Sequence, residues 1–140
     1  ICGIVTRSEK GRRDLNVELG ADYPEFGDYF EALKVTQPAA VSISTYPDTH
    51  AQYAMAAMEA GADVFIEKPL AETVEEAEEI VAKAREHGKI AGCHNGTPEY
   101  ALKRIEMGFQ FVTVSSDARM LASGSQGVLN TIRAGQPPAS

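Results

Sequence analysis

The feature that most constrains this chain is the alternation of short apolar segments with longer segments of helical character. Apolar runs of strand length occupy residues 1–6, 39–45, 62–67, 89–95 and 109–115, and a helix-like segment follows each run. Short connections between such elements favour parallel strands joined by right-handed crossovers. Because the runs are apolar throughout, we expect helices on both faces of the sheet. The sequence therefore predicts an α/β fold with a mostly parallel sheet of about five strands.

Capping residues, glycines and periodicity define the expected helices. Residues 73–88 form the clearest one, with acids early, bases late and apolar residues at helical spacing. Gly124 and Gly127 weaken the last helix, and residues 23–26 are at most a very short strand. The other expected helices, with capping serine, threonine or proline at several starts, are residues 8–20, 28–36, 47–61, 97–108 and 117–135, followed by a tail at 136–140.

Composition and charge exclude several classes of protein. The 140 residues carry 13 basic and 20 acidic side chains, a net charge of −7, which argues against nucleic-acid binding and attachment to a membrane surface. No apolar run suggests a membrane span, and no signal-peptide pattern opens the chain. We expect Cys2 and Cys93 to be buried free thiols in a reducing compartment. These features predict a single, soluble, cytoplasmic domain.

Ligands of open parallel sheets bind beyond the carboxyl ends of the strands, and polar residues gather at those ends here. Helix capping is an open alternative for Ser8, Thr97 and Asp117. No cap requires a Glu-Lys pair, however, and Pro69 keeps Lys68 out of helical geometry. The five strand ends are Thr6-Arg7-Ser8, Ser44-Thr45-Tyr46, Glu67-Lys68-Pro69, Cys93-His94-Asn95 and Ser115-Ser116-Asp117.

The segment SISTYPDTHAQYAMAAMEAGADVFIEKPLAETVEEAEEIVAKAREHG resembles the glucose-fructose oxidoreductase and inositol dehydrogenase (Gfo/Idh/MocA) family, and the likeness covers residues 1–89. Its marks are the Ser/Thr-rich strand end, the proline and histidine that follow, and the strand ending in Glu-Lys-Pro-Leu. The resemblance implies a Rossmann domain that binds NADP or NAD, and a sugar-like or polyol-like substrate. It also implies that Ser44, Thr45 and Tyr46 line the dinucleotide.

The same resemblance assigns roles to four further residues. His50 would sit near the cofactor, and Glu67 would lie near its ribose or nicotinamide. Lys68 would be the catalytic residue that faces the substrate and polarises its carbon–oxygen bond, and the Lys68-Pro69 peptide is often cis in the family. We expect the Lys68 amine to share a concave region with Thr45 and His94. The alternative is that it points to water and balances nearby acids.

The first segment departs from the family in two ways. The family's first strand and its G-x-G-x-x-G turn would precede Ile1, so we expect a truncated dinucleotide-binding part that is weakly active or inactive alone. Thr6-Arg7-Ser8, with Arg12 and Arg13 one turn on, stand where the family usually has an acid for the adenosine ribose. These residues suit a 2′-phosphate, and a solvated basic helix start is an equal alternative.

Residues 90–140 resemble a different family. GTPEYALKRIEMGFQFVTVSSDARMLASGSQGVLNTIRAG is similar to the last two strand–helix units of the class II pyruvate aldolases, which are metal-dependent TIM barrels that cleave 4-hydroxy-2-oxo acids. We expect no metal site here, because His94 has no acidic partners at ligand spacing. Residues 90–140 are thus expected to form an aldolase-like βαβα part. An engineered chimera, a natural fusion and an assembly artefact all remain open.

Three functions follow from these observations. The first is an NAD(P)-dependent oxidoreductase or its remnant, with a small-molecule partner and with homo-oligomerisation left open. The second is a metal-dependent carbon–carbon lyase. The third is a non-catalytic α/β scaffold.

Overall fold

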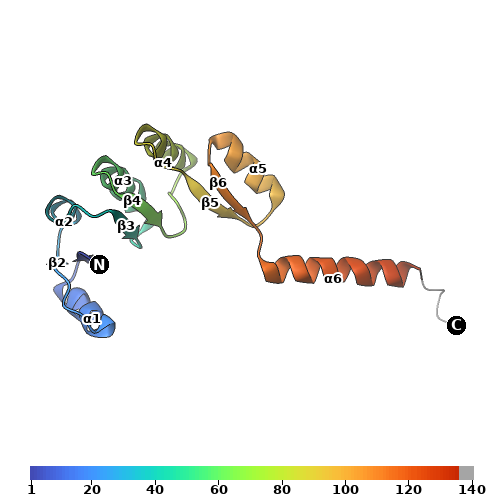
Figure 1. Cartoon of the computed structure of the whole chain (residues 1–140), viewed down its shortest axis with the longest axis horizontal. Coiled ribbons are helices and arrows are strands. Elements are labelled where there is room, and N and C mark those ends of the chain that lie inside the picture. The colour runs from blue at the N-terminus through green and yellow to red at the C-terminus, as the bar shows by residue number, and fades with distance from the viewer. Residues whose placement is uncertain (136–140) are drawn as a thin grey trace. The chain divides into compact units, whose positions relative to one another are not determined.

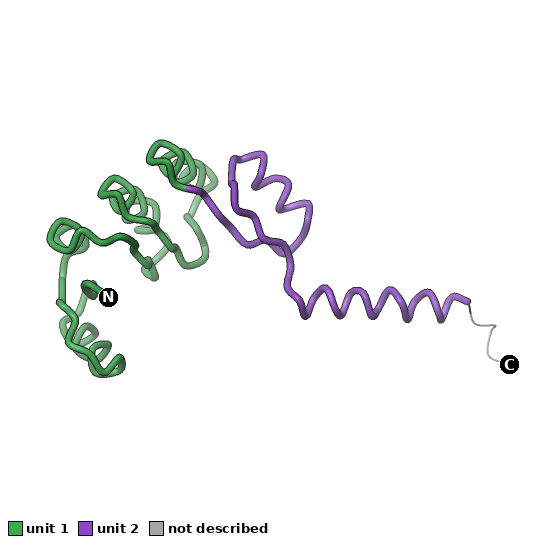
Figure 2. The backbone as a smooth tube through the Cα atoms, in the orientation of Figure 1, with its two compact units in different colours: residues 1–89 green, residues 90–140 purple. Residues whose placement is uncertain are grey.

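A computed structural model describes residues 1–135 and shows strands alternating with helices from the first segment to the last (Figure 1). Every strand pair in it is parallel, so the predicted α/β class is confirmed. The chain divides into two compact units, Ile1–Lys89 and Ile90–Ser140 (Figure 2). The tail predicted at 136–140 lies outside the described residues.

The first unit contains two pairs of strands. β1 (Ile4–Val5) pairs with β2 (Glu25–Phe26), and β3 (Ala40–Ile43) pairs with β4 (Asp63–Ile66). Within the described residues the strands form two-stranded sheets, so the predicted single sheet of about five strands is not confirmed. Strand pairing requires a neighbour across the sheet, which an apolar run does not reveal.

The helices of the first unit begin where capping residues predict. Ser8 and Asp28 each accept a hydrogen bond from the backbone N–H three residues on, at Gly11 and Glu31. Thr73 forms a capping box with Glu76, which fixes the start of the helix predicted most clearly. The four helices are α1 (Glu9–Leu19), α2 (Tyr29–Thr36), α3 (Pro47–Glu59) and α4 (Val74–Glu86).

The core of the first unit lies where α3 packs against β3, β4, α2 and α4. Small side chains on α3 allow close packing, and Ala54 and Ala57 are fully buried. Tyr29 of α2 stacks on Tyr53 of α3 with ring centroids 4.3 Å apart and donates a hydrogen bond to the Tyr53 carbonyl. A β3–β4 pair with α3 behind it therefore forms the rigid support for the strand ends.

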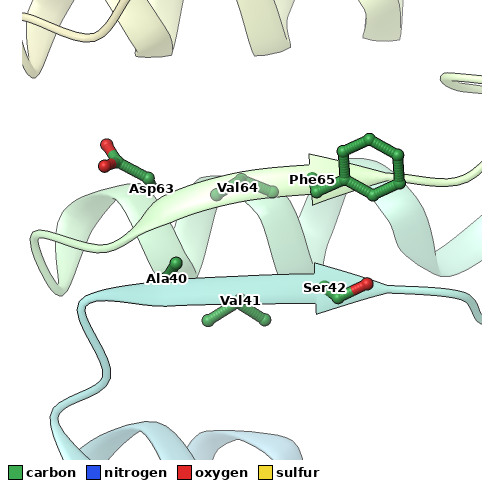
Figure 3. A pocket seen from close by; sticks show the side chains of 6 residues that line it. All are labelled: Ala40, Val41, Ser42, Asp63, Val64 and Phe65. Atoms are coloured by element: carbon green, nitrogen blue, oxygen red, sulfur yellow. The ribbon is translucent and has the colours of Figure 1, made fainter. Parts of the chain in front are cut away.

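An open hollow of about 350 Å³ runs along β3 and β4 (Figure 3). Its lining residues all belong to the two strands: Ala40, Val41, Ser42, Asp63, Val64 and Phe65. None of the predicted site residues lines it. The hollow is therefore separate from the strand ends, where the sequence placed the site.

The second unit has one parallel pair, β5 (Gly92–Asn95) with β6 (Phe111–Val114), and the helix α5 (Pro98–Met107) between them in sequence. The last helix, α6 (Asp117–Ala134), contains no buried residue. No helix among the described residues is long and apolar enough to cross a membrane.

Both cysteines are free thiols, but the prediction that both are buried was wrong. Cys2, which precedes the two-residue strand β1, is exposed. Cys93 in β5 is partly buried.

Candidate functional site

The candidate site lies at the carboxyl ends of β1, β3 and β4, within the first unit. All ten residues that the sequence singled out for catalysis or cofactor binding belong to this unit. Side-chain contacts connect the ends of β1 and β3, and the ends of β3 and β4, although β1 and β3 share no strand pairing.

Arg7 and Tyr46 form the contact between the ends of β1 and β3. The guanidinium carbon of Arg7 lies 5.0 Å from the centre of the Tyr46 ring, within the range of a cation–π interaction. Both side chains are exposed, and Tyr46 keeps 65% of its accessible surface. The contact therefore brings together two predicted site residues that are 39 positions apart in the sequence.

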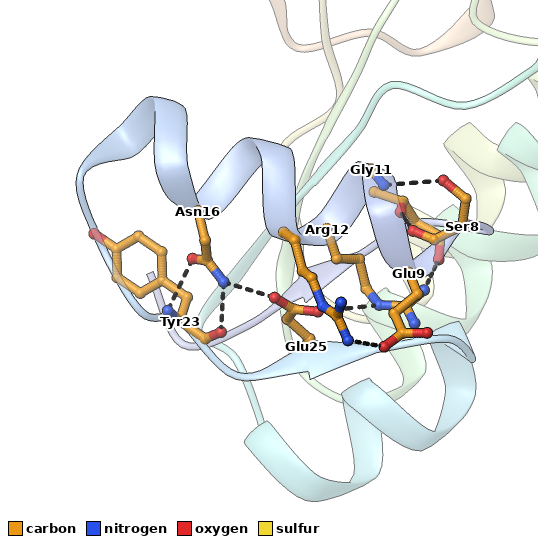
Figure 4. A network of polar contacts seen from close by, with 9 residues as sticks. Ser8, Glu9, Gly11, Arg12, Asn16, Tyr23 and Glu25 are labelled. Atoms are coloured by element: carbon orange, nitrogen blue, oxygen red, sulfur yellow. Dashed lines mark hydrogen bonds and ion pairs between the residues drawn. The ribbon is translucent and has the colours of Figure 1, made fainter.

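The polar network at the end of β1 uses Arg12 as a structural residue (Figure 4). Its Nη1 donates a 2.6 Å hydrogen bond to the Thr6 carbonyl, and its Nε lies 3.6 Å from a Glu25 carboxylate oxygen. Asn16, which is buried, donates to the same carboxylate and exchanges hydrogen bonds with the Tyr23 backbone. Arg12 therefore holds α1 against β1 and β2.

The other bases near the start of α1 are also paired with acids. Arg13 contacts Glu9, and Lys10 contacts Asp14, each one turn apart on the helix. Among the described residues, Arg7 takes part in no ion pair. Of the basic residues at positions 7–13, Arg7 is thus the one whose charge is not balanced by a neighbouring acid.

A pair of threonine hydroxyls holds the end of β3 in place. Thr45 Oγ1 and Thr49 Oγ1 are 2.7 Å apart, and Thr49 Oγ1 donates to the Tyr46 carbonyl at 2.8 Å. Sequence reasoning missed Thr49, although a threonine three residues into a helix commonly bonds back to the preceding turn. Ser44, the third predicted residue of this strand end, is exposed.

His50 connects the end of β3 to the segment after β4. Only 1% of its surface is exposed, and its two ring nitrogens lie 2.8 Å from the Pro69 carbonyl oxygen and 3.1 Å from the Thr45 carbonyl oxygen. A neutral imidazole can donate to only one of these oxygens at a time. His50 therefore lies packed between two strand ends and donates to one of them, and its predicted position near a cofactor remains a prediction.

Glu67, Lys68 and Pro69 emerge directly beyond β4. The Glu67 N–H continues the ladder to the Ile43 carbonyl, and the Lys68-Pro69 peptide is cis. The Lys68 side chain is 91% exposed, with its ammonium 3.8 Å from the Glu67 carboxylate. This is the arrangement expected if the amine points to water.

His94, one of the two residues expected near the Lys68 amine, belongs to the second unit. Its Nδ1 lies 2.9 Å from the Thr113 hydroxyl on the neighbouring strand. Residues 1–135 contain no group of three or more His, Cys, Asp or Glu side chains arranged to hold a metal ion.

Residues 1–95 match a family described as the oxidoreductase family with an NAD-binding Rossmann fold. An uncharacterized oxidoreductase from Bacillus subtilis (strain 168) is 41% identical over 95 residues, which cover 64% of this chain and 24% of that protein. The 1,5-anhydro-D-fructose reductase of Ensifer adhaerens is 45% identical over 56 residues, 40% of this chain and 17% of that protein.

A solved structure shows the same likeness. A 3-ketoreductase from Actinomadura kijaniata, in complex with TDP-benzene and NADP, aligns with a TM-score of 0.57 at 28% identity. The alignment covers 64% of this chain and 28% of that one. The chain thus spans about a quarter or less of the length of the curated relatives named above, and about 28% of this structure.

Proposed function

Because the chain belongs to the oxidoreductase family with the NAD-binding Rossmann fold, we propose that it is part of an NAD(P)-dependent oxidoreductase acting on a small sugar-like or polyol-like molecule. The reductase and ketoreductase named above act on carbohydrate derivatives or ketones, which supports this class of substrate. The observation that carries the proposal is the Arg7 side chain, exposed and without an acidic partner at the end of β1.

The residues at the strand ends have the chemistry that a dinucleotide requires. Arg7 offers planar donors to a phosphate, and the exposed Tyr46 ring lies beside it. The Ser8 hydroxyl lies beside Arg7 in sequence and accepts the Gly11 N–H, so its own proton can be donated to a phosphate or ribose oxygen. The Thr6 hydroxyl donates to the Ser8 carbonyl and would contribute only as an acceptor. The nicotinamide, when bound, supplies or accepts the hydride, and these side chains would hold and orient it.

Lys68 would act on the substrate. Its position just beyond β4 places its ammonium at the strand-end edge, and its pairing with Glu67 at 3.8 Å is loose enough to be exchanged for a substrate oxygen. A proton donor or positive charge beside that oxygen would polarise the carbon–oxygen bond as hydride is transferred. Ser44, Thr45 and Glu67 would form the remaining wall of the site.

The cofactor preference should favour NADP or be equal for the two dinucleotides. Arg7 stands where an acid would hold the 2′-hydroxyl of NAD, and an acid there would repel a 2′-phosphate. Since the 140 residues contain no G-x-G-x-x-G turn, we expect weak binding, in the sub-millimolar range.

Calorimetric titration of the chain with NADP and NAD tests this proposal. Arg7→Ala should weaken NADP binding roughly fivefold and leave NAD unchanged, as expected when about 1 kcal/mol of charge-assisted contact is lost at an exposed site. Arg13→Ala, which removes a base already paired with Glu9, is the matched control and should change neither affinity. A clear preference for NAD, or no binding of either dinucleotide, would contradict the proposal.

A further inference from the structure

Tyr46 occupies a position where its residue type is locally unfavourable. It is the N-cap residue of α3, and its side chain makes no capping hydrogen bond. Serine, threonine, aspartate and asparagine stabilise this position because their side chains accept a hydrogen bond from the first turn. α1, α2 and α4 of the same unit have such a residue there, and in each the cap bond is present. A tyrosine at this position therefore needs another reason.

The only cation–π partner of Tyr46 among the described residues is Arg7, at 5.0 Å. Stacking uses the flat face of the guanidinium, while the N–H donors of the guanidinium lie in its plane and point outward. A ring that contacts this face leaves the in-plane N–H donors of Arg7 open to a phosphate. The Thr49 hydroxyl donates a hydrogen bond to the Tyr46 carbonyl, which restrains the backbone from which the ring extends.

We propose that Tyr46 is a specificity-determining residue that positions Arg7 to receive the 2′-phosphate of NADP. Tyr46 acts through Arg7: the ring restricts a long, exposed side chain that would otherwise lose more conformational entropy when it binds a phosphate. This inference rests on the proposed function, because it requires a dinucleotide at this strand-end edge.

Titrations of the full chain with NADP and NAD test the role of the ring. Tyr46→Leu should weaken NADP binding about two- to fivefold, the fold-change that corresponds to the roughly 0.5–1 kcal/mol of an exposed cation–π contact, with NAD affected much less. Tyr46→Phe keeps the ring and should keep the ratio of the two affinities. In an Arg7→Ala background, Tyr46→Leu should have no further effect on that ratio, because the guanidinium that the ring positions is absent.

Tyr46→Ser separates a specificity role from damage to the fold. Serine supplies the missing cap, so this variant should unfold at a higher urea concentration than the parent chain while losing the NADP preference. Tyr100→Leu is the matched control, because Tyr100 makes a similar contact with Lys103, at 5.5 Å, in the second unit. It should leave both affinities unchanged.

The outcomes distinguish the inference from the function on which it rests. The role of Tyr46 is refuted and the proposed function survives if the parent chain binds the two dinucleotides equally. The same holds if the parent chain prefers NADP and the ratio is unchanged in Tyr46→Leu, Tyr46→Ser and Tyr46→Phe. If the parent chain binds neither dinucleotide or prefers NAD, both are refuted. If the NADP preference is lost in Tyr46→Leu and Tyr46→Ser but kept in Tyr46→Phe, the result supports both the role of Tyr46 and the proposed function.

Discussion

Two buried rings in the first unit carry polar groups, and each has a partner that accounts for its burial. His50 has carbonyl oxygens at both nitrogens, and the Tyr29 hydroxyl donates to the Tyr53 carbonyl at 2.9 Å. Buried polar groups without partners are costly, so these bonds fix where α2 and α3 can sit relative to the strand ends. Both residues consequently give predictions about stability.

Replacing His50 with alanine should lower the free energy of unfolding by about 2–3 kcal/mol, because it removes a side chain that is only 1% exposed, opens a cavity and takes away the hydrogen bond to one strand-end carbonyl. Urea unfolding followed by circular dichroism measures the change. His94→Ala is the control: His94 is exposed and should contribute less than about 0.5 kcal/mol. Equal effects of the two substitutions would contradict this role of His50.

Burial, and secondarily the negative charge of Tyr53 when it ionises, raises the pKa of Tyr29 from 10.0 to about 12. The folded state therefore keeps the Tyr29 proton more tightly than the unfolded state does. Its contribution to stability is present in full below pH 10 and is lost as the pH rises through about 12. Urea unfolding across this range should show a steeper loss of stability in the parent chain than in Tyr29→Phe. Parallel slopes would contradict the assignment.

At the scale of elements, local signals located both the helices and the strands, but they did not give the lengths or the partners of the strands. Thr73 with Glu76 marks the start of α4, and Gly88 follows its end, because caps involve residues a few positions apart. The apolar run at 1–6 yields only the two residues of β1, since the length of a strand depends on a partner distant in sequence. The candidate site shows the same difference between local signals and contacts distant in sequence. Its strand-end position could be predicted, whereas the bond from His50 to Pro69, 19 positions away, could not.

α6 is the element whose stability depends most on its own sequence, because none of its residues is buried. Gly124 and Gly127 each weaken it, and a Cβ atom added at either would meet no atom within 4 Å. Alanine at each position should stabilise the helix by about 0.8–1 kcal/mol. Slower hydrogen exchange of the α6 amides would show this effect.

The control for these substitutions is Gly61→Ala. Gly61 also has open space around it, but its φ of +88° is a backbone conformation that disfavours a side chain, so alanine there should destabilise the first unit. If alanine at 124 and 127 leaves α6 exchange unchanged, intrinsic helix propensity does not limit the stability of this helix.

At the scale of the whole molecule, the matched family covers residues 1–95, and the aldolase likeness of residues 90–140 stays a hypothesis. We expect no retro-aldol cleavage of 4-hydroxy-2-oxo acids with added magnesium, manganese or cobalt, because the described residues present no cluster of metal ligands. A coupled assay for pyruvate is the measurement. Metal-dependent pyruvate release that a chelator abolishes would restore the lyase hypothesis.

Because the described strands pair in twos, the chain has unpaired strand edges that affect its tendency to aggregate. Each two-stranded sheet has rows of backbone amides and carbonyls along both outer edges, and such edges can recruit strands from other molecules. The net charge of −7 opposes this by mutual repulsion, which salt screens over about 10 Å at 0.1 M and about 3 Å at 1 M. The chain should therefore stay monomeric in dilute, low-salt solution, whereas high salt should favour aggregation through the strand edges.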